Sequence, residues 1–578
     1  MAAMRAARLA GVGALAALGL YLARRRLVAR ALGLPPARHA VTVERNLAIT
    51  MPDGVVLRAD HYAPRSPGRF PAILIRTPYG RGREVGAPLG LLSIMLCRAM
   101  AARGYHVVAQ TVRGRFDSGG SFEPSVHEAD DGRATLEWIT RQPWYAGAIG
   151  MAGESYLGYA QWAAAVAAPT LVQALVPRAT TAHFYAAIHL DGAFALDLAL
   201  RWINVLGSLE RAAHYPLRTR LRGLDPRVAE SRLAPGFAHL PLRTADMAAT
   251  GRAVPFYRDW LDHPDADDSY WQQVDHREDA AQVPAAVHLI GGWYDLFLRE
   301  TIADYAALCA AGRAPYLTIG PWSHTDGRAI LAGLRETLAW CDAQLKGERG
   351  RRREQPVRVY VMGAGQWRDL DTWPPPTRPA TYYLHPGGAL RREQPPDGAA
   401  PDRYRYDPAD PTPVMGGPLL LTGGPRDNRP LEARPDVLCY TTPPLEDDVE
   451  ILGAARLELY VQSSQGYIDL LGRLCDVGPD GRSINICDGL RRLVPGDGEA
   501  QADGSRCVCV ELWPTAHRFR RGRRLRLQVA SGGHPRWSRN PGTGEPLATA
   551  TTLVAVDHTV YHDRARPSAL ILPIACKE

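Results

Sequence analysis

The region that most constrains the fold lies between Pro71 and Ile319, where short apolar segments alternate with helical stretches. The apolar segments are Pro71–Ile75, Tyr105–Ala109, Ile149–Ala152, Leu171–Val176, Val287–Ile290 and Tyr316–Ile319. Helical patterns over 91–102, 132–141 and 300–311 separate several of them. Short strands that are apolar on both faces and alternate with helices are typical of a parallel sheet covered on both sides. We therefore expect an α/β core.

The regions around this alternation predict further units. Val41–Ile49 and Val55–Tyr62, joined by Pro52-Asp53-Gly54, predict a hairpin. The mostly helical stretch 182–280 predicts a cap over the sheet edge, with a helical decoration that makes no substrate contact as the alternative. Beyond Gly350 the chain is rich in Pro and Gly, and short alternating strands such as Val357–Val361 predict a β-sandwich. The predicted division is a leader at 1–40, an α/β domain at 41–181 and 281–350, a cap at 182–280 and a β-sandwich at 351–578.

One strand of the predicted core ends in an unusual turn. Gly153-Glu154-Ser155-Tyr156-Leu157-Gly158 lies between an apolar strand and an Ala-rich helix. A serine between small residues at such a junction is typical of a nucleophile elbow, in which the hydroxyl projects above the sheet and faces a helix N-terminus. The match to G-x-S-x-G is incomplete, because Leu157 occupies the second glycine position and Gly158 follows one residue later. An ordinary strand-to-helix turn is the alternative.

Other predicted strands also end in residues that carry chemistry. Tyr79 follows the first strand, Asp295 follows Gly291-Gly292-Trp293-Tyr294, and His324 follows Gly320-Pro321-Trp322-Ser323. Ligands bind beyond the carboxyl ends of parallel strands, so we expect these side chains to share one edge with Ser155. The order Ser, Asp, His is that of the α/β hydrolases. Singly, Asp295 fits a strand-end cap and His324 a loop histidine, but their joint placement favours a catalytic triad.

Charge and cysteine content argue against two other classes of protein. The formal net charge of +8 is modest for 578 residues, although arginines cluster at 351–353 and 518–526. Within Arg524–Val529 apolar residues alternate with arginines, which predicts the solvated face of a strand, so nucleic-acid binding is not expected. None of the nine cysteines has zinc-ligand spacing, and Cys507 and Cys509 are separated by one residue. The sequence predicts no metal and a reducing compartment.

The amino terminus carries a short apolar run, Leu9–Ala23, with Arg5 and Arg8 before it and arginines at 24–26 after it. A membrane-spanning helix needs about 20 apolar residues, and a cleaved signal needs a small-x-small site where this chain has arginines. We expect residues 5–30 to form an uncleaved anchor or a membrane-surface helix, with the body in the cytoplasm. A dispensable Ala-rich leader is the alternative.

Several motifs together resemble the cocaine esterase and X-Pro dipeptidyl-peptidase family of serine hydrolases, from about Val41 to the carboxyl end. The motifs are Arg76-Thr77-Pro78-Tyr79, Arg113-Gly114-Arg115-Phe116-Asp117-Ser118-Gly119-Gly120, Glu137-Trp138-Ile139, Gln142-Pro143-Trp144, Gly150 to Gly158, Gly292-Trp293-Tyr294-Asp295, Gly320 to His324, Met362-Gly363 with Trp367, Tyr406-Asp407-Pro408 and Ser538-Arg539-Asn540. This resemblance implies an α/β-hydrolase core with an inserted helical cap and a carboxyl-terminal jelly-roll β-sandwich.

The resemblance also implies a role for particular residues, and the Ser-x-x-Gly spacing is normal in that family. The implied roles are nucleophile for Ser155, base for His324, orienting carboxylate for Asp295, oxyanion hole for the Tyr79 hydroxyl and the Tyr156 backbone amide, and substrate pocket for Phe297 and Trp322. No cofactor or metal is implied.

The expected chemistry is acyl transfer to Ser155 from an ester or amide of a small molecule or short peptide. We favour an esterase or amidase, because no motif marks a clamp for a free ammonium group. An X-Pro dipeptidyl-peptidase or amino-acid ester hydrolase would need such a carboxylate, for which Asp191 and Asp197 are candidates. A non-catalytic binding protein on the same fold is a further alternative, and homo-oligomerisation is left open.

Overall fold

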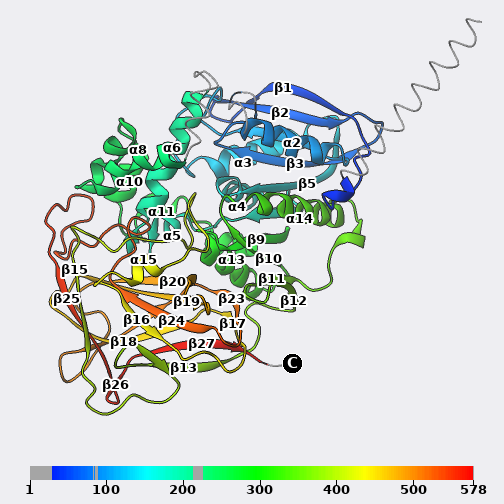
Figure 1. Cartoon of the computed structure of the whole chain (residues 1–578). Helices are drawn as coiled ribbons and strands as arrows, with labels where there is room; N and C mark the ends of the chain where they lie inside the picture. Colours follow the sequence, from blue (N-terminus) through cyan, green and yellow to red (C-terminus); the bar gives the residue numbers. More distant parts are fainter. Residues whose placement is uncertain (1–28, 83, 85–88, 213–225, 577–578) are drawn as a thin grey trace, which may run out of the picture.

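The structure, a computed structural model, describes residues 29–82, 84, 89–212 and 226–576. Its first body is built on a sheet of ten described strands (Figure 1). In spatial order these are β1 (Val41–Thr50), β2 (Val56–Pro64), β4 (His106–Thr111), β3 (Phe70–Thr77), β5 (Tyr145–Glu154), β6 (Ala174–Arg178), β9 (Ala286–Tyr294), β10 (Tyr316–Ser323), β11 (Val357–Val361) and β12 (Gln366–Leu370). The strands from β4 to β11 are parallel, whereas β1, β2 and β12 pair antiparallel to their neighbours.

Helices cover both faces of this sheet, because alternate side chains along each strand point to opposite faces. On β3, Ile73 packs in one apolar cluster with Cys97 of α2 (Leu89–Ala101), and α14 (Gly327–Leu345) contributes to the same cluster. Leu74 packs instead with Leu136 of α3 (Glu128–Thr140) and Trp162 of α4 (Tyr156–Ala167), beside α13 (Leu298–Ala310). The protein has an α/β-hydrolase fold, as the alternating sequence pattern predicts.

A helical insertion follows β6, in the range where the sequence predicts a cap. Its helices are α5 (Phe184–Ile188), α6 (Leu196–Ala212), α8 (Pro226–Ala238), the 3-10 turn η1 (Leu242–Thr244), α9 (Ala245–Thr250), α10 (Pro255–Asp262), α11 (Ser269–Gln272) and α12 (Arg277–Gln282). A two-stranded hairpin, β7 (His189–Leu190) with β8 (Ala193–Phe194), interrupts it. Trp202 and Trp260 of the insertion share an apolar cluster with Tyr156 of α4, so the insertion packs against the start of that helix.

The rest of the chain forms a mostly antiparallel β domain, shown below the α/β body in Figure 1. Its elements are β13 (Thr377–His385), β14 (Ala389–Arg391), β15 (Asp402–Tyr406), α15 (Arg429–Glu432), β16 (Leu438–Thr441), β17 (Val449–Gly453), β18 (Arg456–Ser463), β19 (Ile468–Val477), β20 (Ser483–Leu493), β21 (Glu499–Ala500), β22 (Arg506–Glu511), β23 (Thr515–Phe519), β24 (Arg524–Ala530), β25 (Val556–Asp563), β26 (Arg566–Pro567) and β27 (Ala569–Ala575), with the 3-10 turn η2 (Arg349–Arg351) before β11.

One expectation for this region is corrected. Val357–Val361, expected in the β-sandwich, is β11 and pairs with β10, so the α/β sheet extends past residue 350. Local alternation indicates a strand but not which sheet it joins. The arginines of β24 alternate with buried leucines and lie on its more exposed face, where Arg526 is half-buried and its Nη1 lies 2.5 Å from the Glu432 carboxylate.

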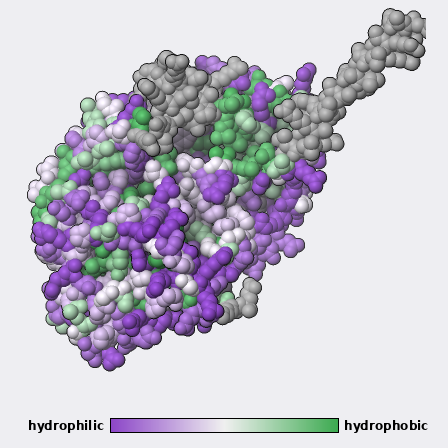
Figure 2. Space-filling view, viewed as in Figure 1, coloured by the Kyte–Doolittle hydropathy of each residue, from purple (hydrophilic) through white to green (hydrophobic). Residues whose placement is uncertain are grey.

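An apolar area of the described surface lies along α2. Leu91 and Met95, one helical turn apart, are 53% and 59% exposed. Figure 2 shows this apolar area in the upper part of the view. No helix among the described residues is both long and apolar enough to cross a membrane. The leader expected to contact a membrane lies mostly outside the described residues, which begin at Ala29.

Candidate active site

Ser155 lies at the sharp junction between β5 and α4. Its backbone has φ 60° and ψ −126°, a conformation that costs energy for any residue other than glycine. The turn is tight because a Cβ on Gly153 would lie 2.4 Å from the Leu157 Cβ. A Cβ on Gly158 would lie 2.4 Å from the Thr180 Cγ2. The second glycine is therefore needed at 158, where helix α4 crosses the segment after β6, and not at 157.

Hydrogen bonds to β6 and to the segment after it hold this turn. The Ser155 N–H donates to the carbonyl oxygen of Arg178 at 2.9 Å, and the Thr180 hydroxyl donates to the Ser155 carbonyl oxygen at 2.8 Å. The Arg178 guanidinium also forms an ion pair with Glu154. The segment after β6 thus supports the strained serine from both sides, which is how a native structure keeps such a conformation.

The Asp295 and His324 side chains meet at the carboxyl edge of the sheet, after β9 and β10. His324 Nδ1 lies 2.9 Å from Asp295 Oδ2, and both side chains are buried. Asp295 Oδ1 accepts a hydrogen bond from the backbone N–H of Phe297 at 2.8 Å. A carboxylate on Nδ1 selects the tautomer whose Nε2 can accept a proton. Asp295 is therefore fixed in the orientation that a histidine base requires.

His324 lies in the same electrostatic environment as the serine turn. Burial disfavours the imidazolium, but the charge and the hydrogen bond of Asp295 outweigh it and raise the pKa of His324, with a smaller contribution from Glu154 beside Ser155. The Phe297 ring lies 5.7 Å from the His324 ring and also lines the cavity that contains Ser155. The three residues predicted as a triad are therefore brought to one edge of the sheet.

Tyr79 follows β3 at this same edge. Its hydroxyl accepts a hydrogen bond from Trp202 Nε1 at 3.0 Å and lies within hydrogen-bonding reach of the Ser155 side chain. Burial raises the pKa of the Tyr79 phenol, so it stays a neutral O–H donor. A neutral donor beside the nucleophile is what a developing oxyanion needs.

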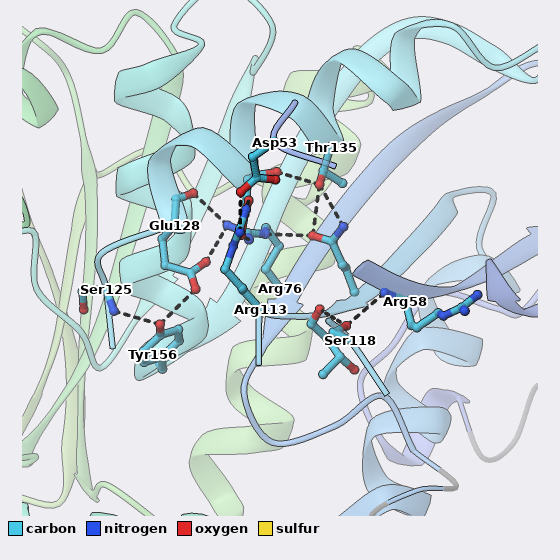
Figure 3. Close-up of polar contacts among 12 residues, drawn as sticks. Asp53, Arg58, Arg76, Arg113, Ser118, Ser125, Glu128, Thr135 and Tyr156 are labelled. Atoms are coloured by element: carbon cyan, nitrogen blue, oxygen red, sulfur yellow. Dashed lines mark hydrogen bonds and ion pairs between the residues drawn. The ribbon is translucent and has the colours of Figure 1, made fainter. Parts of the chain in front are cut away.

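The Tyr156 hydroxyl is hydrogen-bonded to Glu128 and Ser125, whereas its backbone amide starts α4 directly after Ser155. Its hydroxyl donates to Glu128 Oε1 and accepts from the Ser125 N–H, both at 2.9 Å (Figure 3). Glu128 in turn pairs with the fully buried Arg76 at 2.5 Å. This buried chain of charge and hydrogen bonds anchors the first turn of α4. The roles of Arg76 and Glu128 were not predicted from the sequence, although Arg76 is a charged residue inside the apolar strand β3 and Glu128 begins α3.

An apolar pocket adjoins Ser155, with about 490 Å³ of empty space including its opening to solvent. Its described lining is Tyr79, Ser155, Tyr156, Tyr159, Thr180, Thr181, Phe184, Ile188, Leu198, Ala199, Trp202, Trp260, Phe297 and Leu420. No acidic or basic side chain belongs to that described lining. Leu420 comes from the β domain, and no local sequence signal indicates its presence here.

Three residues considered for the pocket lie elsewhere. The Trp322 ring packs 5.7 Å from the Trp367 ring and does not line the cavity, whereas Phe297 does. Asp197 pairs with Arg201 at 2.5 Å, and Asp191 pairs with Arg299. Neither aspartate contributes to the described lining, so the two candidates for an ammonium clamp are both turned to arginines.

Comparisons with known proteins identify the family of this chain. Residues 53–326 match the model of the X-Pro dipeptidyl-peptidase (S15) family, and residues 350–571 match that of the X-Pro dipeptidyl-peptidase C-terminal non-catalytic domain. A cocaine esterase from Rhodococcus sp. (strain MB1 Bresler) is 33% identical over 582 residues, covering 92% of this chain and 98% of that protein.

Solved structures share the fold over nearly the whole chain. An aminopeptidase from a marine sediment archaeon, Thaumarchaeota archaeon, has a TM-score of 0.78 at 22% identity, covering 93% of this chain and 97% of the other. An α-amino acid ester hydrolase has a TM-score of 0.77 at 23% identity, with the same coverage. From the family matches and the relative at 33% identity, the chain belongs to the X-Pro dipeptidyl-peptidase (S15) family and is a serine hydrolase of the esterase or dipeptidyl-peptidase type.

Proposed function

We propose that this protein hydrolyses carboxylic esters whose acyl group is apolar and uncharged. The observation that supports this most is the cavity beside Ser155, whose described lining is aromatic and aliphatic with no charged side chain. A free ammonium group placed there would lose its hydration without gaining a carboxylate partner. An uncharged apolar acyl group would gain from leaving water.

The proposed mechanism forms an acyl-enzyme. Ser155 Oγ attacks the ester carbonyl carbon while His324 Nε2 takes the serine proton, and the Tyr79 hydroxyl with the Tyr156 N–H stabilises the oxyanion. The imidazolium then gives its proton to the alkoxide leaving group. Water repeats the sequence on the acyl-enzyme and releases the carboxylic acid, restoring Ser155.

The competing activities are release of Xaa-Pro dipeptides and hydrolysis of amino-acid esters. The solved structures that share this fold include an aminopeptidase and an α-amino acid ester hydrolase. A panel of nitrophenyl acyl esters against Xaa-Pro nitroanilides separates the two. We expect the esters to be preferred, and strong nitroanilide cleavage with poor ester turnover would overturn the proposal. Labelling with a fluorophosphonate should disappear in Ser155→Ala and persist in Ser231→Ala, a matched change at an exposed serine of α8. Persistent labelling of Ser155→Ala would reject the nucleophile.

We further propose that residues 5–30 attach the protein to a membrane from the cytoplasmic side. The apolar run 9–23 and the arginines at 24–26 support this, because basic residues that follow a hydrophobic segment favour the cytoplasmic side. Flotation of the full chain with membranes, resistant to high salt, is the expected result. Recovery of all the protein in the supernatant at low salt would contradict it.

A further inference from the structure

A second large cleft lies at the opposite edge of the sheet from Ser155. It is lined by residues at the start of β3, before β4, at the start of β5 and at the end of α14, and contains about 1240 Å³ of empty space including its open mouth. Ala148 of β5 lines this cleft, and Ser155 directly follows the same strand. Seven residues of extended chain span roughly 20 Å. The cleft is therefore separate from the catalytic pocket.

Cationic side chains dominate this cleft. Its described lining includes Arg38, Arg69, Arg103, Lys346 and Arg351, together with His39, against the carboxylates of Asp342 and Glu348. One of these carboxylates is already occupied: Asp342 Oδ1 lies 2.8 Å from Lys346 Nζ and accepts from the Tyr105 hydroxyl at 2.6 Å. The described lining therefore carries more cationic than carboxylate side chains.

Two of the arginines are available to a ligand. Arg38 and Arg69 are exposed, and within the described residues neither forms an ion pair with a carboxylate. Burial, followed by the charges of Lys346 and Arg38, lowers the pKa of His39, which agrees with a positive potential at this edge. A guanidinium group offers a fork of donors that matches phosphate oxygens in two parallel hydrogen bonds.

The leader enters the structure at this cleft. Pro35 and Pro36 line it, and the backbone N–H of Arg38 donates to the Ala102 carbonyl oxygen at 2.8 Å. Figure 1 shows the first described residues, in dark blue, beside α14, where Arg335 Nε donates to the Leu32 carbonyl oxygen at 2.7 Å. The sequence before Glu44 contains no acidic residue, so the leader adds positive charge and cannot neutralise the cleft.

We propose that this cleft binds the phosphate of an anionic phospholipid headgroup, with Arg38 and Arg69 as its principal donors. It rests on the proposed membrane attachment of residues 5–30 and adds a second contact with the bilayer. A single weak anchor gives reversible binding, which a basic surface strengthens. The edge of the sheet at which the parallel strands begin then faces the membrane. The catalytic pocket, at the edge where the strands end, faces the cytoplasm. Substrates would reach Ser155 from solution.

Vesicle binding by the full chain tests this. The vesicles are phosphatidylcholine alone, or phosphatidylcholine mixed with phosphatidylglycerol, at low ionic strength. The double variant Arg38→Glu/Arg69→Glu should lose at least about tenfold in affinity for the anionic vesicles and change little on the neutral ones. The matched control is Arg391→Glu/Arg403→Glu on the β domain, where both arginines are exposed and no ion pair is found among the described residues. It should lose less than about twofold.

The outcomes separate this proposal from those on which it depends. Equal binding of wild type and Arg38→Glu/Arg69→Glu to anionic vesicles would overturn the headgroup site while leaving the leader attachment standing. Failure of the wild type to bind either vesicle would overturn both. A thermal shift with inorganic phosphate that Arg38→Glu/Arg69→Glu abolishes, without any change in vesicle affinity, would assign the cleft to a soluble phosphate and reject the lipid. Turnover of a soluble nitrophenyl ester should be unchanged in both double variants. This result would show that the variants are folded and that esterase activity does not depend on the cleft.

Discussion

The indole N–H of Trp202, on the helical insertion, donates a hydrogen bond to the hydroxyl oxygen of Tyr79, on the α/β core, at 3.0 Å. An indole N–H is a donor only, so the Tyr79 hydroxyl must accept this bond. Its own proton is then left to point elsewhere, and the Ser155 side chain is within its reach. The insertion thus orients the phenol proposed for the oxyanion hole, besides lining the cavity.

Replacing Trp202 should therefore slow turnover by way of Tyr79. We expect Trp202→Phe to reduce kcat by about tenfold, against about a hundredfold or more for Tyr79→Phe. The double variant should be little worse than Tyr79→Phe alone, because Trp202 acts only through the Tyr79 hydroxyl, which Tyr79→Phe already removes. Trp260→Phe, which alters another indole of the cavity, should raise KM more than it lowers kcat. Additive losses in the double variant would exclude the orienting role of Trp202.

The pH dependence of activity should report on His324. Its pKa is raised above 6.5, because the Asp295 charge outweighs burial. Protonated His324 cannot accept the serine proton, so kcat/KM should increase with pH along a limb whose midpoint lies above 6.5. Asp295→Asn should move this limb to lower pH and reduce kcat by about ten-thousandfold. A wild-type midpoint clearly below 6.5 would show that Asp295 does not stabilise the imidazolium.

Gly158, the displaced glycine of the serine turn, should be required because a larger residue there would clash with Thr180. Alanine normally stabilises a helix relative to glycine by about 1 kcal/mol. At Gly158, however, the new Cβ would lie 2.4 Å from the Thr180 Cγ2, and Thr180 holds the Ser155 carbonyl oxygen. We expect Gly158→Ala to destabilise the fold by about 1 to 3 kcal/mol and to lose most esterase activity.

Thermal unfolding and turnover measure this effect. The control is Gly327→Ala at the start of α14, where no atom lies within 4 Å of the added Cβ. That variant should keep wild-type stability and activity. A Gly158→Ala protein with both properties intact would mean that α4 and the segment after β6 can move apart without disturbing Ser155.

A buried carboxyl group on α13 should make stability fall as pH rises. Burial raises the pKa of Asp304 from 3.8 to about 8. Between these values the folded state holds a proton that the unfolded chain has released, so the free energy of unfolding decreases with increasing pH, by up to about 1.4 kcal/mol per pH unit. Asp304→Asn keeps an oxygen for the Ala182 N–H, which donates to Asp304 at 3.1 Å, and removes this titration.

Denaturant unfolding across that range measures the difference. The decrease of the unfolding free energy with pH should become shallower in Asp304→Asn. It should stay unchanged in Asp279→Asn, a matched change at an exposed aspartate of α12. Parallel pH profiles for wild type and Asp304→Asn would show that Asp304 is ionised in the folded protein.

Local sequence patterns predicted which strands and helices form better than they predicted the residues at which these begin and end. Near-continuous apolar runs indicated β3, β5, β9 and β10, because strands buried on both faces have no polar periodicity to mislead the assignment. The helix expected from Gly132 begins instead at Glu128. Its first turn carries Glu128, Asp130 and Asp131, whose negative charges suit a helix N-terminus but lack the apolar periodicity on which the prediction depended.

The sequence by itself determined the α/β core and the three residues at its carboxyl edge, since strand order and chain direction place Ser155, Asp295 and His324 together. Only the tertiary structure decided what surrounds them. Trp202 lies 123 positions from Tyr79, and Leu420 comes from another domain. Such pairings depend on how the insertion and the β domain pack against the sheet, and packing between units leaves no periodic signal in the chain. The pocket beside Ser155 arises from that packing, whereas the basic cleft at the far edge is formed within the α/β body, by the segment before β1, the starts of β3 and β5 and the end of α14.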